Sequence, residues 1–177
     1  MYLAAEHRCK KVIACDAREK PLAQAQHNLA LHGCTNAECR LGDGLSVLQP
    51  DEVDDIVLAG LSGITISAIL AAAPAFWQPR YRFVFVPASK PEHLRRWLCE
   101  QGFALLAETP VEAAGYLYTV MHAQYTGKKI QPTPLFCVVG LTANGTPQAH
   151  AYLKKAAASL RKSGRNTLAR EVEQCLQ

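Results

Sequence analysis

Residues 55–63 read DIVLAGLSG, a short apolar run that leads directly into a loop of small residues. The apolar part has the length and composition of a buried β-strand. The residues from Ile64 onward are mostly small or apolar up to Pro74, and they predict a helix that ends there. A strand that passes through a tight loop into a helix is the unit from which parallel sheets are built, so this stretch indicates an α/β fold.

The same alternation of strand and helix continues on both sides of this stretch. Three further strands are predicted, at residues 11–17, 37–41 and 82–86. One helix is predicted from about Pro21 to Gly33 and another from Pro91 to Gly102, because proline favours the first turn of a helix and glycine its end. Strands that are separated by helices predict a parallel sheet.

Two consecutive strand-like runs follow, at 104–108 and 116–124, with a turn around Gly115 between them. No helix is predicted between the two runs, so they predict an antiparallel hairpin that closes the sheet. The predicted fold class is therefore α/β, with a doubly wound sheet that helices cover on both faces.

The composition changes after this hairpin. Several Gly and Pro residues indicate an irregular connection, and two helical stretches follow at about 148–163 and 166–177, divided at Gly164. The net charge is −2 for residues 1–124 and +6 for residues 125–177. We therefore expect a sheet domain at 1–124 and a linker with a basic helical hairpin at 125–177. Such a hairpin suits a polyanion such as RNA, and a solvated helix face is the equally simple alternative.

The composition as a whole is that of a globular protein. Of the 177 residues, 49% are hydrophobic and 19% are charged, which excludes a disordered or collagen-like chain. The sequence has no apolar run long enough to span a bilayer and no signal-peptide pattern at its start, so we expect a cytoplasmic protein without a membrane partner. The seven cysteines include no C-x-x-C pair and are expected to be free thiols.

Three features are predicted at the carboxyl ends of strands, where open α/β sheets bind their ligands. Asp16 ends the first strand, and its carboxylate can accept hydrogen bonds from both hydroxyls of a ribose or can serve a turn or helix cap. The glycines of the GDG segment at 42–44 let the backbone approach a planar ligand, and Asp43 between them can accept a hydrogen bond from an amine. The same segment is also a common turn sequence. The loop at 60–63 is either an open floor for a base or a tight turn.

Taken together, these motifs resemble those of one protein family. The motifs are IACD at 13–16, RLGDGL at 40–45, DIVLAGLSG at 55–63 and PEHLRRWL at 91–98, together with Asn28. They resemble the bacterial TrmK family of tRNA (adenine-22-N1)-methyltransferases, which use S-adenosylmethionine on a Rossmann-like class I methyltransferase fold. The resemblance covers nearly the whole chain, including the basic tail, which in that family forms a coiled-coil-like domain taken to help hold tRNA.

The resemblance implies roles for particular residues. It makes Asp16 the acceptor for the ribose hydroxyls, although the family usually has Glu there, and it makes Asp43, with Gly42 and Gly44, the adenine contact of the cofactor. Gly60 becomes part of the floor of the transfer site, where the family more often reads A-G-M-G-G and this chain reads AGLSG. In the tail, the residues expected to bind RNA are Lys154, Lys155, Arg161, Lys162 and Arg165.

The family's first strand and glycine-containing loop should precede Tyr2, and we expect this chain to lack them. That expectation leaves the adenosine half of the cofactor pocket without the methionine half. The leading hypothesis is a methyltransferase acting on N1 of an adenine in tRNA, and the alternative is a non-catalytic tRNA-binding remnant. A nicotinamide oxidoreductase is disfavoured because no G-x-G-x-x-G precedes Asp16. The sequence assigns no catalytic residue, no metal site and no oligomeric state.

Overall fold

A computed structural model describes residues 4, 6 and 9–176 of the chain. The chain forms two compact units, Met1–Glu52 with Ile69–Ala73, and Val53–Ala68 with Pro74–Gln177. Tyr2, before which the family's first strand and glycine-containing loop are expected, lies outside the described residues, and so does Gln177 at the end of the last predicted helix. The division into a sheet domain and a tail after residue 124 stays a prediction.

The first unit contains a βαβ arrangement. Strands β1 (Val12–Asp16) and β2 (Ala37–Leu41) are parallel, and their register places Asp16 opposite Leu41. Helix α2 (Glu19–Leu31) connects them and buries Leu22 and Leu29. A short 3-10 helix, η1 (Pro50–Glu52), follows the turn after β2. Both strands and the helix form close to where the sequence predicts them.

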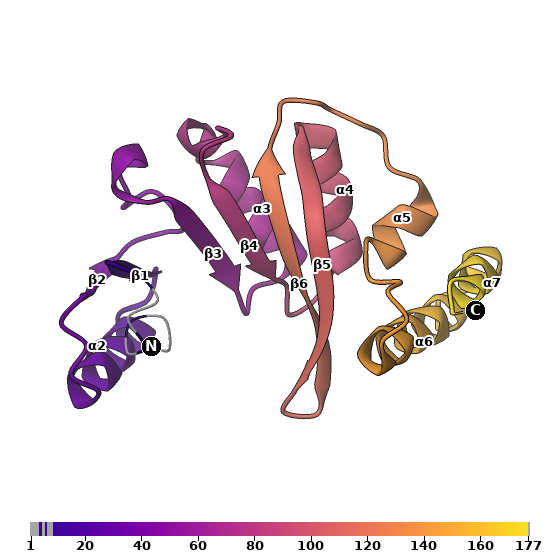
Figure 1. Cartoon of the computed structure of the whole chain (residues 1–177), viewed down its shortest axis with the longest axis horizontal. Coiled ribbons are helices and arrows are strands. Elements are labelled where there is room, and N and C mark those ends of the chain that lie inside the picture. Colours follow the sequence, from indigo (N-terminus) through magenta and orange to yellow (C-terminus); the bar gives the residue numbers. More distant parts are fainter. Residues whose placement is uncertain (1–3, 5, 7–8, 177) are drawn as a thin grey trace. The chain divides into compact units, whose positions relative to one another are not determined.

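The second unit is built on a four-stranded sheet with the order β3-β4-β6-β5. Its strands are β3 (Asp55–Ala59), β4 (Arg82–Val86), β5 (Phe103–Ala113) and β6 (Tyr116–Tyr125). The first two are parallel, and β6 pairs antiparallel with both β4 and β5. Behind this sheet in the view of Figure 1 lie helices α3 (Gly63–Ala71), of which residues 63–68 belong to this unit, and α4 (Pro91–Gln101). The predicted α/β class with an antiparallel hairpin at the edge is confirmed.

The hairpin is longer than predicted, because β5 continues beyond Glu108 to Ala113. Pro110 lies within the strand, opposite Thr119. A proline is tolerated there because β5 is the edge of the sheet and one side of the strand needs no backbone donor. A shift of register between Leu105 and Ala107 marks a bulge in the same strand.

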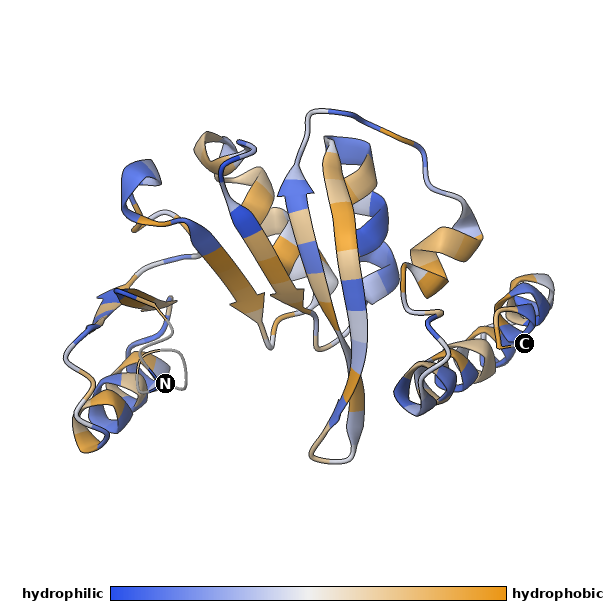
Figure 2. Ribbon diagram, in the orientation of Figure 1, coloured by the Kyte–Doolittle hydropathy of each residue, from blue (hydrophilic) through white to orange (hydrophobic). Residues whose placement is uncertain are grey.

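The core of the second unit is rich in aromatic side chains. Phe83, Phe85 and Phe103 are fully buried, and the rings of Phe83 and Phe103 meet edge to face with centroids 5.4 Å apart. Trp77 and Trp97 pack around Phe103 at centroid distances of 5.6 and 5.9 Å. Figure 2 shows β3 and β4 as hydrophobic along most of their length, which is typical of strands in an α/β core.

Three helices end the chain, α5 (Pro134–Val139), α6 (Pro147–Lys162) and α7 (Asn166–Gln174). The last two correspond to the predicted helical hairpin, and they bury Leu153, Leu160 and Val172 in a shared cluster. Helix α5 lies in the stretch that the sequence predicts as irregular. Its first turn is capped by the Thr133 hydroxyl, which accepts a hydrogen bond from the backbone N–H of Phe136 at 3.1 Å.

Among the described residues, no helix is long and apolar enough to cross a membrane. All seven cysteines are free thiols, as predicted. Residues 4, 6 and 9–176 also contain no group of three or more His, Cys, Asp or Glu side chains arranged to hold a metal ion.

Candidate functional site

In the first unit, Asp16 and Gly42 lie together at the carboxyl ends of β1 and β2. The backbone N–H of Gly42 donates to the carbonyl oxygen of Asp16 at 3.0 Å, so the hydrogen bonding between the strands continues one residue past the end of β2. One carboxylate oxygen of Asp16 accepts from the backbone N–H of Arg18 at 2.8 Å. The other oxygen has no hydrogen bond within the described part of the chain, and the side chain is 35% exposed. Asp16 therefore serves a turn and keeps one oxygen available to a ligand.

The turn after β2 presents Asp43 to solvent. The carbonyl oxygen of Asp43 accepts from the N–H of Ser46 at 3.1 Å and from its hydroxyl at 2.7 Å, which closes the turn. The Asp43 side chain is exposed and has no hydrogen bond to any described residue. Its carboxylate is thus free to accept hydrogen bonds from an amine.

The two glycines beside Asp43 have local structural reasons to be glycine. A Cβ on Gly42 would lie 2.0 Å from Cγ1 of Val47. Gly44 has a φ of +58°, and a Cβ there would lie 2.7 Å from Cγ2 of Ile69. Tight packing under the turn therefore accounts for both glycines, and it fixes the backbone on which the Asp43 carboxylate is carried.

Arg40 connects this turn to β2 and η1 through hydrogen bonds. Its guanidinium donates to Glu38 at 2.7 Å, to Glu52 at 2.8 Å and to the carbonyl oxygen of Val47 at 2.9 Å. These hydrogen bonds lower the pKa of both Glu38 and Glu52 to about 2. The result is a network of charges that joins β2 to η1 and to the turn between them.

In the second unit, two loops run side by side at the carboxyl ends of β3 and β4. Gly63 donates its N–H to the carbonyl oxygen of Ser89 at 2.7 Å, and Ala88 donates to Leu61 at 2.8 Å. A Cβ on Gly63 would lie 2.2 Å from the carbonyl oxygen of Lys90, so only glycine permits this approach. Gly60 has a φ of +76° and open space where a Cβ would project. The loop is thus rigidly held and open above Gly60, which supports both of the interpretations made from the sequence.

The predicted site residues fall into two groups. The structure brings Asp16 together with Gly42, Asp43 and Gly44 in the first unit, and it places Gly60 in the second. Their roles toward a cofactor stay predictions. Phe85 of β4 is fully buried in the core, while Tyr116, at the turn of the hairpin, is 62% exposed.

The basic residues predicted to bind RNA differ in what they contact. Arg161 pairs with Glu173 at 2.7 Å, and Arg165 pairs with Glu92 at 2.7 Å. Lys154, Lys155 and Lys162 are exposed on α6 and form no ion pair with the described residues. The two arginines therefore also hold helices together, and the three lysines extend into solvent.

Sequence reasoning missed a buried charge cluster centred on Arg95 in α4. Arg95 donates to Glu108 at 2.6 Å and to the Tyr152 hydroxyl at 2.9 Å, and both charged side chains are fully buried. The Thr119 hydroxyl donates to Glu108 at 2.6 Å. Burial would lower the pKa of Arg95, but the neighbouring Tyr152 and Glu108 outweigh that effect and raise it. We call these four residues the Arg95 cluster.

The Arg95 cluster also forms hydrogen bonds with the backbone of α5 and of the residues that follow it. Arg95 donates to the carbonyl oxygens of Cys137 and Val138 at 2.8 and 2.7 Å. Glu108 accepts from the backbone N–H of Leu141 at 3.1 Å. The cluster therefore joins α4, β5, β6, α5 and α6 within the second unit. The one signal in the sequence is that Arg95 is four residues from Cys99, on the buried side of α4.

Comparison with known proteins agrees with this arrangement. The model of a family described as "Methyltransferase domain" matches residues 1–121. The chain belongs to the methyltransferase domain family. Within that family, it is 30% identical over 124 residues to the tRNA (adenine(22)-N(1))-methyltransferase of Bacillus subtilis, a match that covers 70% of this chain and 52% of that protein. The chain thus spans about half the length of the curated relatives it matches.

Solved structures of methyltransferases share the fold. The B. subtilis M1A22 tRNA methyltransferase TrmK superposes with a TM-score of 0.83 at 22% identity, over 97% of this chain and 85% of that one. M. capricolum TrmK, solved with S-adenosyl-homocysteine, superposes with a TM-score of 0.80 at 19% identity, over 99% of this chain and 86% of that one. The resemblance to the TrmK family is confirmed, and the methyltransferase fold extends through the C-terminal helices.

Proposed function

We propose that this protein transfers a methyl group from S-adenosylmethionine to N1 of an adenine in tRNA, the adenine at position 22. The observation that carries the proposal is the 30% identity to the B. subtilis enzyme within a match to the methyltransferase domain family. Because tRNA is processed in the cytoplasm, we infer that the protein acts there. The basic tail, with its exposed Lys154, Lys155 and Lys162, supports an RNA partner.

The residues of the first unit fit the adenosine part of the cofactor. The oxygen of Asp16 that lacks a partner can accept from a ribose hydroxyl, and the exposed Asp43 carboxylate can accept from the exocyclic amine of adenine. Asp16 does not have to break a short salt bridge to do so, because Nε of Arg18 is 3.7 Å from its Oδ1. Asp43 has no ion pair with a described residue.

The chemistry needs alignment more than base catalysis. S-adenosylmethionine would supply an electrophilic methyl group to the lone pair of N1, leaving S-adenosylhomocysteine and a positive charge on the base. N1 of adenine is already a nucleophile, so the residues of the protein have to hold the base in line and exclude water. A base in a folded tRNA must leave its stack to be reached, and the open space above Gly60 suits a flat ligand.

Calorimetric titration of the full chain with S-adenosylhomocysteine tests the cofactor site without RNA. We expect binding, and we expect Asp43→Asn to weaken it by about tenfold, because the hydrogen bond to the cofactor amine loses the charge that strengthens it. Asp54→Asn removes the same charge from an exposed position elsewhere and should leave the affinity unchanged. A folded chain that binds tRNA and no S-adenosylhomocysteine would instead be the non-catalytic tRNA-binding protein.

Transfer of a labelled methyl group to unmodified tRNA tests the substrate. We expect incorporation into tRNA with adenine at position 22 and none into the same tRNA with guanine there. Equal incorporation into both would show that a different base is methylated.

A further inference from the structure

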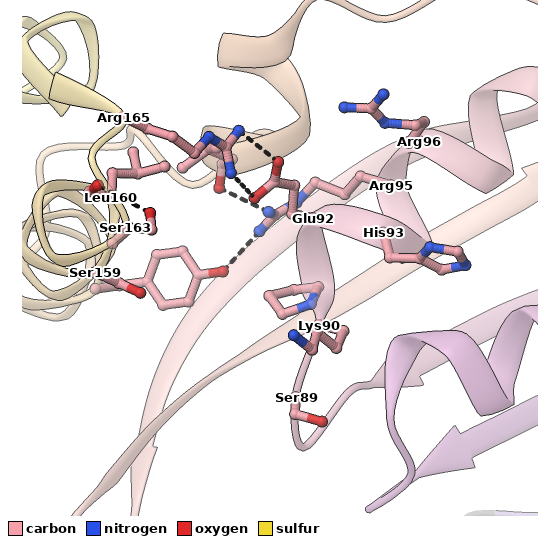
Figure 3. A pocket seen from close by; sticks show the side chains of 14 residues that line it. Ser89, Lys90, Glu92, His93, Arg95, Arg96, Ser159, Leu160, Ser163 and Arg165 are labelled. Carbon is pink, nitrogen blue, oxygen red and sulfur yellow. Dashed lines mark hydrogen bonds and ion pairs between the residues drawn. The ribbon is translucent and has the colours of Figure 1, made fainter. Parts of the chain in front are cut away.

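The second unit contains a cleft between the start of α4 and the C-terminal part of α6, with Arg165 just beyond α6 also in its lining. We call it the α4–α6 cleft; its cavity volume is about 820 Å³. Residues of α4 form one wall, and Ser159, Leu160 and Ser163 of α6 are on the other, as Figure 3 shows. Neither the cofactor site nor the predicted RNA-binding residues account for the α4 wall.

The lining of the cleft is strongly basic. It includes Lys90, Arg95, Arg96 and Arg165, and Glu92 is the only acidic residue among its lining side chains. Two of the four cations are already neutralised, since Arg165 pairs with Glu92 and Arg95 pairs with Glu108. An excess of positive charge therefore remains on the α4 wall.

That excess lies on Lys90 and Arg96. Both side chains are exposed, and neither has an ion pair with the residues that the structure describes. Arg96 interacts with the Cys137 thiol, and burial raises the pKa of that thiol, so Cys137 stays neutral and does not compensate the charge. Figure 3 shows Lys90 at the start of α4 and Arg96 further along the same helix, apart from the Glu92–Arg165 pair.

Neutral donors accompany these cations. Ser89 and Ser159 line the cleft, are exposed, and have no side-chain hydrogen bond to a described residue. Lysine, arginine and serine side chains are the usual contacts to phosphate oxygens in nucleic-acid complexes. The lining thus has the chemistry of a phosphodiester site.

The walls of the cleft are held in place before any ligand arrives. Arg165 contacts Glu92 through two hydrogen bonds, at 2.7 and 3.0 Å, which also lower the pKa of Glu92. Arg95 joins the same two walls through the Tyr152 hydroxyl. A preorganised cleft loses little conformational freedom on binding.

The cleft begins beside the loops at the carboxyl ends of β3 and β4. Lys90 ends the second of these loops, and its carbonyl oxygen is in close contact with Gly63 of the first. A nucleic-acid strand whose base enters above Gly60 would continue past Lys90 into the cleft. We propose that the α4–α6 cleft binds the sugar-phosphate backbone next to the target adenine, with Lys90 and Arg96 contacting phosphates. This inference rests on the proposed function, in that the RNA is the tRNA substrate.

The test compares two variants of the full chain that remove the same charge. Lys90→Gln with Arg96→Gln changes the cleft, and Lys128→Gln with Lys129→Gln changes two exposed lysines outside it. Affinity for fluorescently labelled, unmodified tRNA is measured at several salt concentrations, and affinity for S-adenosylhomocysteine by calorimetry. Thermal unfolding checks that both variants are folded, and Lys90→Arg with Arg96→Lys keeps the charges in place.

We expect the cleft variant to bind tRNA about tenfold more weakly at 0.1 M salt. The slope of log K against log salt should become less steep by about 1.5, because two phosphate contacts are lost. The control variant should change both much less, the charge-keeping variant should bind like wild type, and no variant should change cofactor affinity. If the cleft and control variants weaken tRNA binding equally, or if neither weakens it, the proposed binding of tRNA in the cleft is wrong and the proposed function still stands. Wild-type protein that binds tRNA but no cofactor would overturn the proposed function alone, and absence of tRNA binding would overturn both.

Discussion

Arg95 and Arg96 are neighbours in the sequence with opposite environments. Arg95 is 1% exposed and has hydrogen bonds to two side chains and two carbonyl oxygens, whereas Arg96 is exposed at the α4–α6 cleft. A helix turns by about 100° per residue, so adjacent positions reach different faces. A buried guanidinium needs partners for its charge and its donors, and here Glu108 and Tyr152 supply them.

Breaking the Arg95 cluster should destabilise the second unit strongly. Glu108→Gln keeps the size of the side chain and leaves Arg95 buried without a counter-charge, so we expect the free energy of unfolding to fall by about 3–5 kcal/mol. Both tryptophans of the chain, Trp77 and Trp97, lie in this unit, so tryptophan fluorescence during urea unfolding reports its stability.

The control for this prediction is an exposed ion pair. Arg161→Gln breaks the pair with Glu173, whose two side chains are 47% and 41% exposed. Water screens such a pair, so the loss should be below about 1 kcal/mol. Similar losses in the two variants would contradict the structural role of the Arg95 cluster.

At the scale of elements, β2 and η1 are joined mainly by charge. The pKa values of Glu38 and Glu52 are lowered to about 2 by hydrogen bonds from Arg40. For carboxylates with a lowered pKa, the stabilisation is complete above the unfolded value near 4.5 and is lost as the pH falls toward 2. The ion-pair network that joins β2 to η1 is therefore expected to persist until the pH falls toward 2.

NMR titration of the glutamate carboxyl carbons measures this directly. In the wild-type chain, we expect Glu38 and Glu52 to titrate with midpoints of about 2. Arg40→Gln should move both midpoints upward toward 4.5, and Arg18→Gln, which removes an exposed arginine at Asp16, should not. Unchanged midpoints in Arg40→Gln would show that another group stabilises the two carboxylates.

At the scale of the whole molecule, charge is unevenly distributed along the chain. Residues 125–177 carry a net charge of +6, and the structure separates their cations into two kinds. Arg161 and Arg165 are paired with acids, while Lys154, Lys155 and Lys162 are exposed on α6 without an ion pair to the described residues. A cation that neutralises an RNA phosphate displaces the counterions bound there. The lysines can do so without breaking an ion pair within the protein, so they should contribute most to RNA affinity.

Replacing Lys154, Lys155 and Lys162 by Gln should lower the salt slope of tRNA binding by about 2. Thermal stability should not change, because none of the three takes part in packing. A variant that replaces Lys20, Lys128 and Lys129 by Gln removes the same charge from exposed positions outside α6. If its salt slope falls equally, binding depends on total charge and α6 has no specific role.

The sequence by itself determined the local elements and the chemistry at their ends. The strands at 37–41, 55–59 and 82–86 and the helix at 91–101 were predictable because apolar runs, Pro91 and Gly102 act over a few residues. The same local signals placed Asp16, Asp43 and Gly60 at strand ends. The confirmed family resemblance rests on these motifs.

Only the tertiary structure decided which charges are buried, paired or free. Helix α5 forms where the sequence predicts an irregular connection, and Arg95 of α4 binds the carbonyl oxygens of its last turn while Glu108 of β5 binds the N–H of Leu141 just beyond it. Arg95 is 13 residues from Glu108 and 57 from Tyr152, and Arg165 is 73 from Glu92. Contacts at such separations depend on how elements pack, and no periodicity within one element encodes them. The α4–α6 cleft, in which Lys90 and Arg96 have no ion pair with a described residue, is a product of that packing.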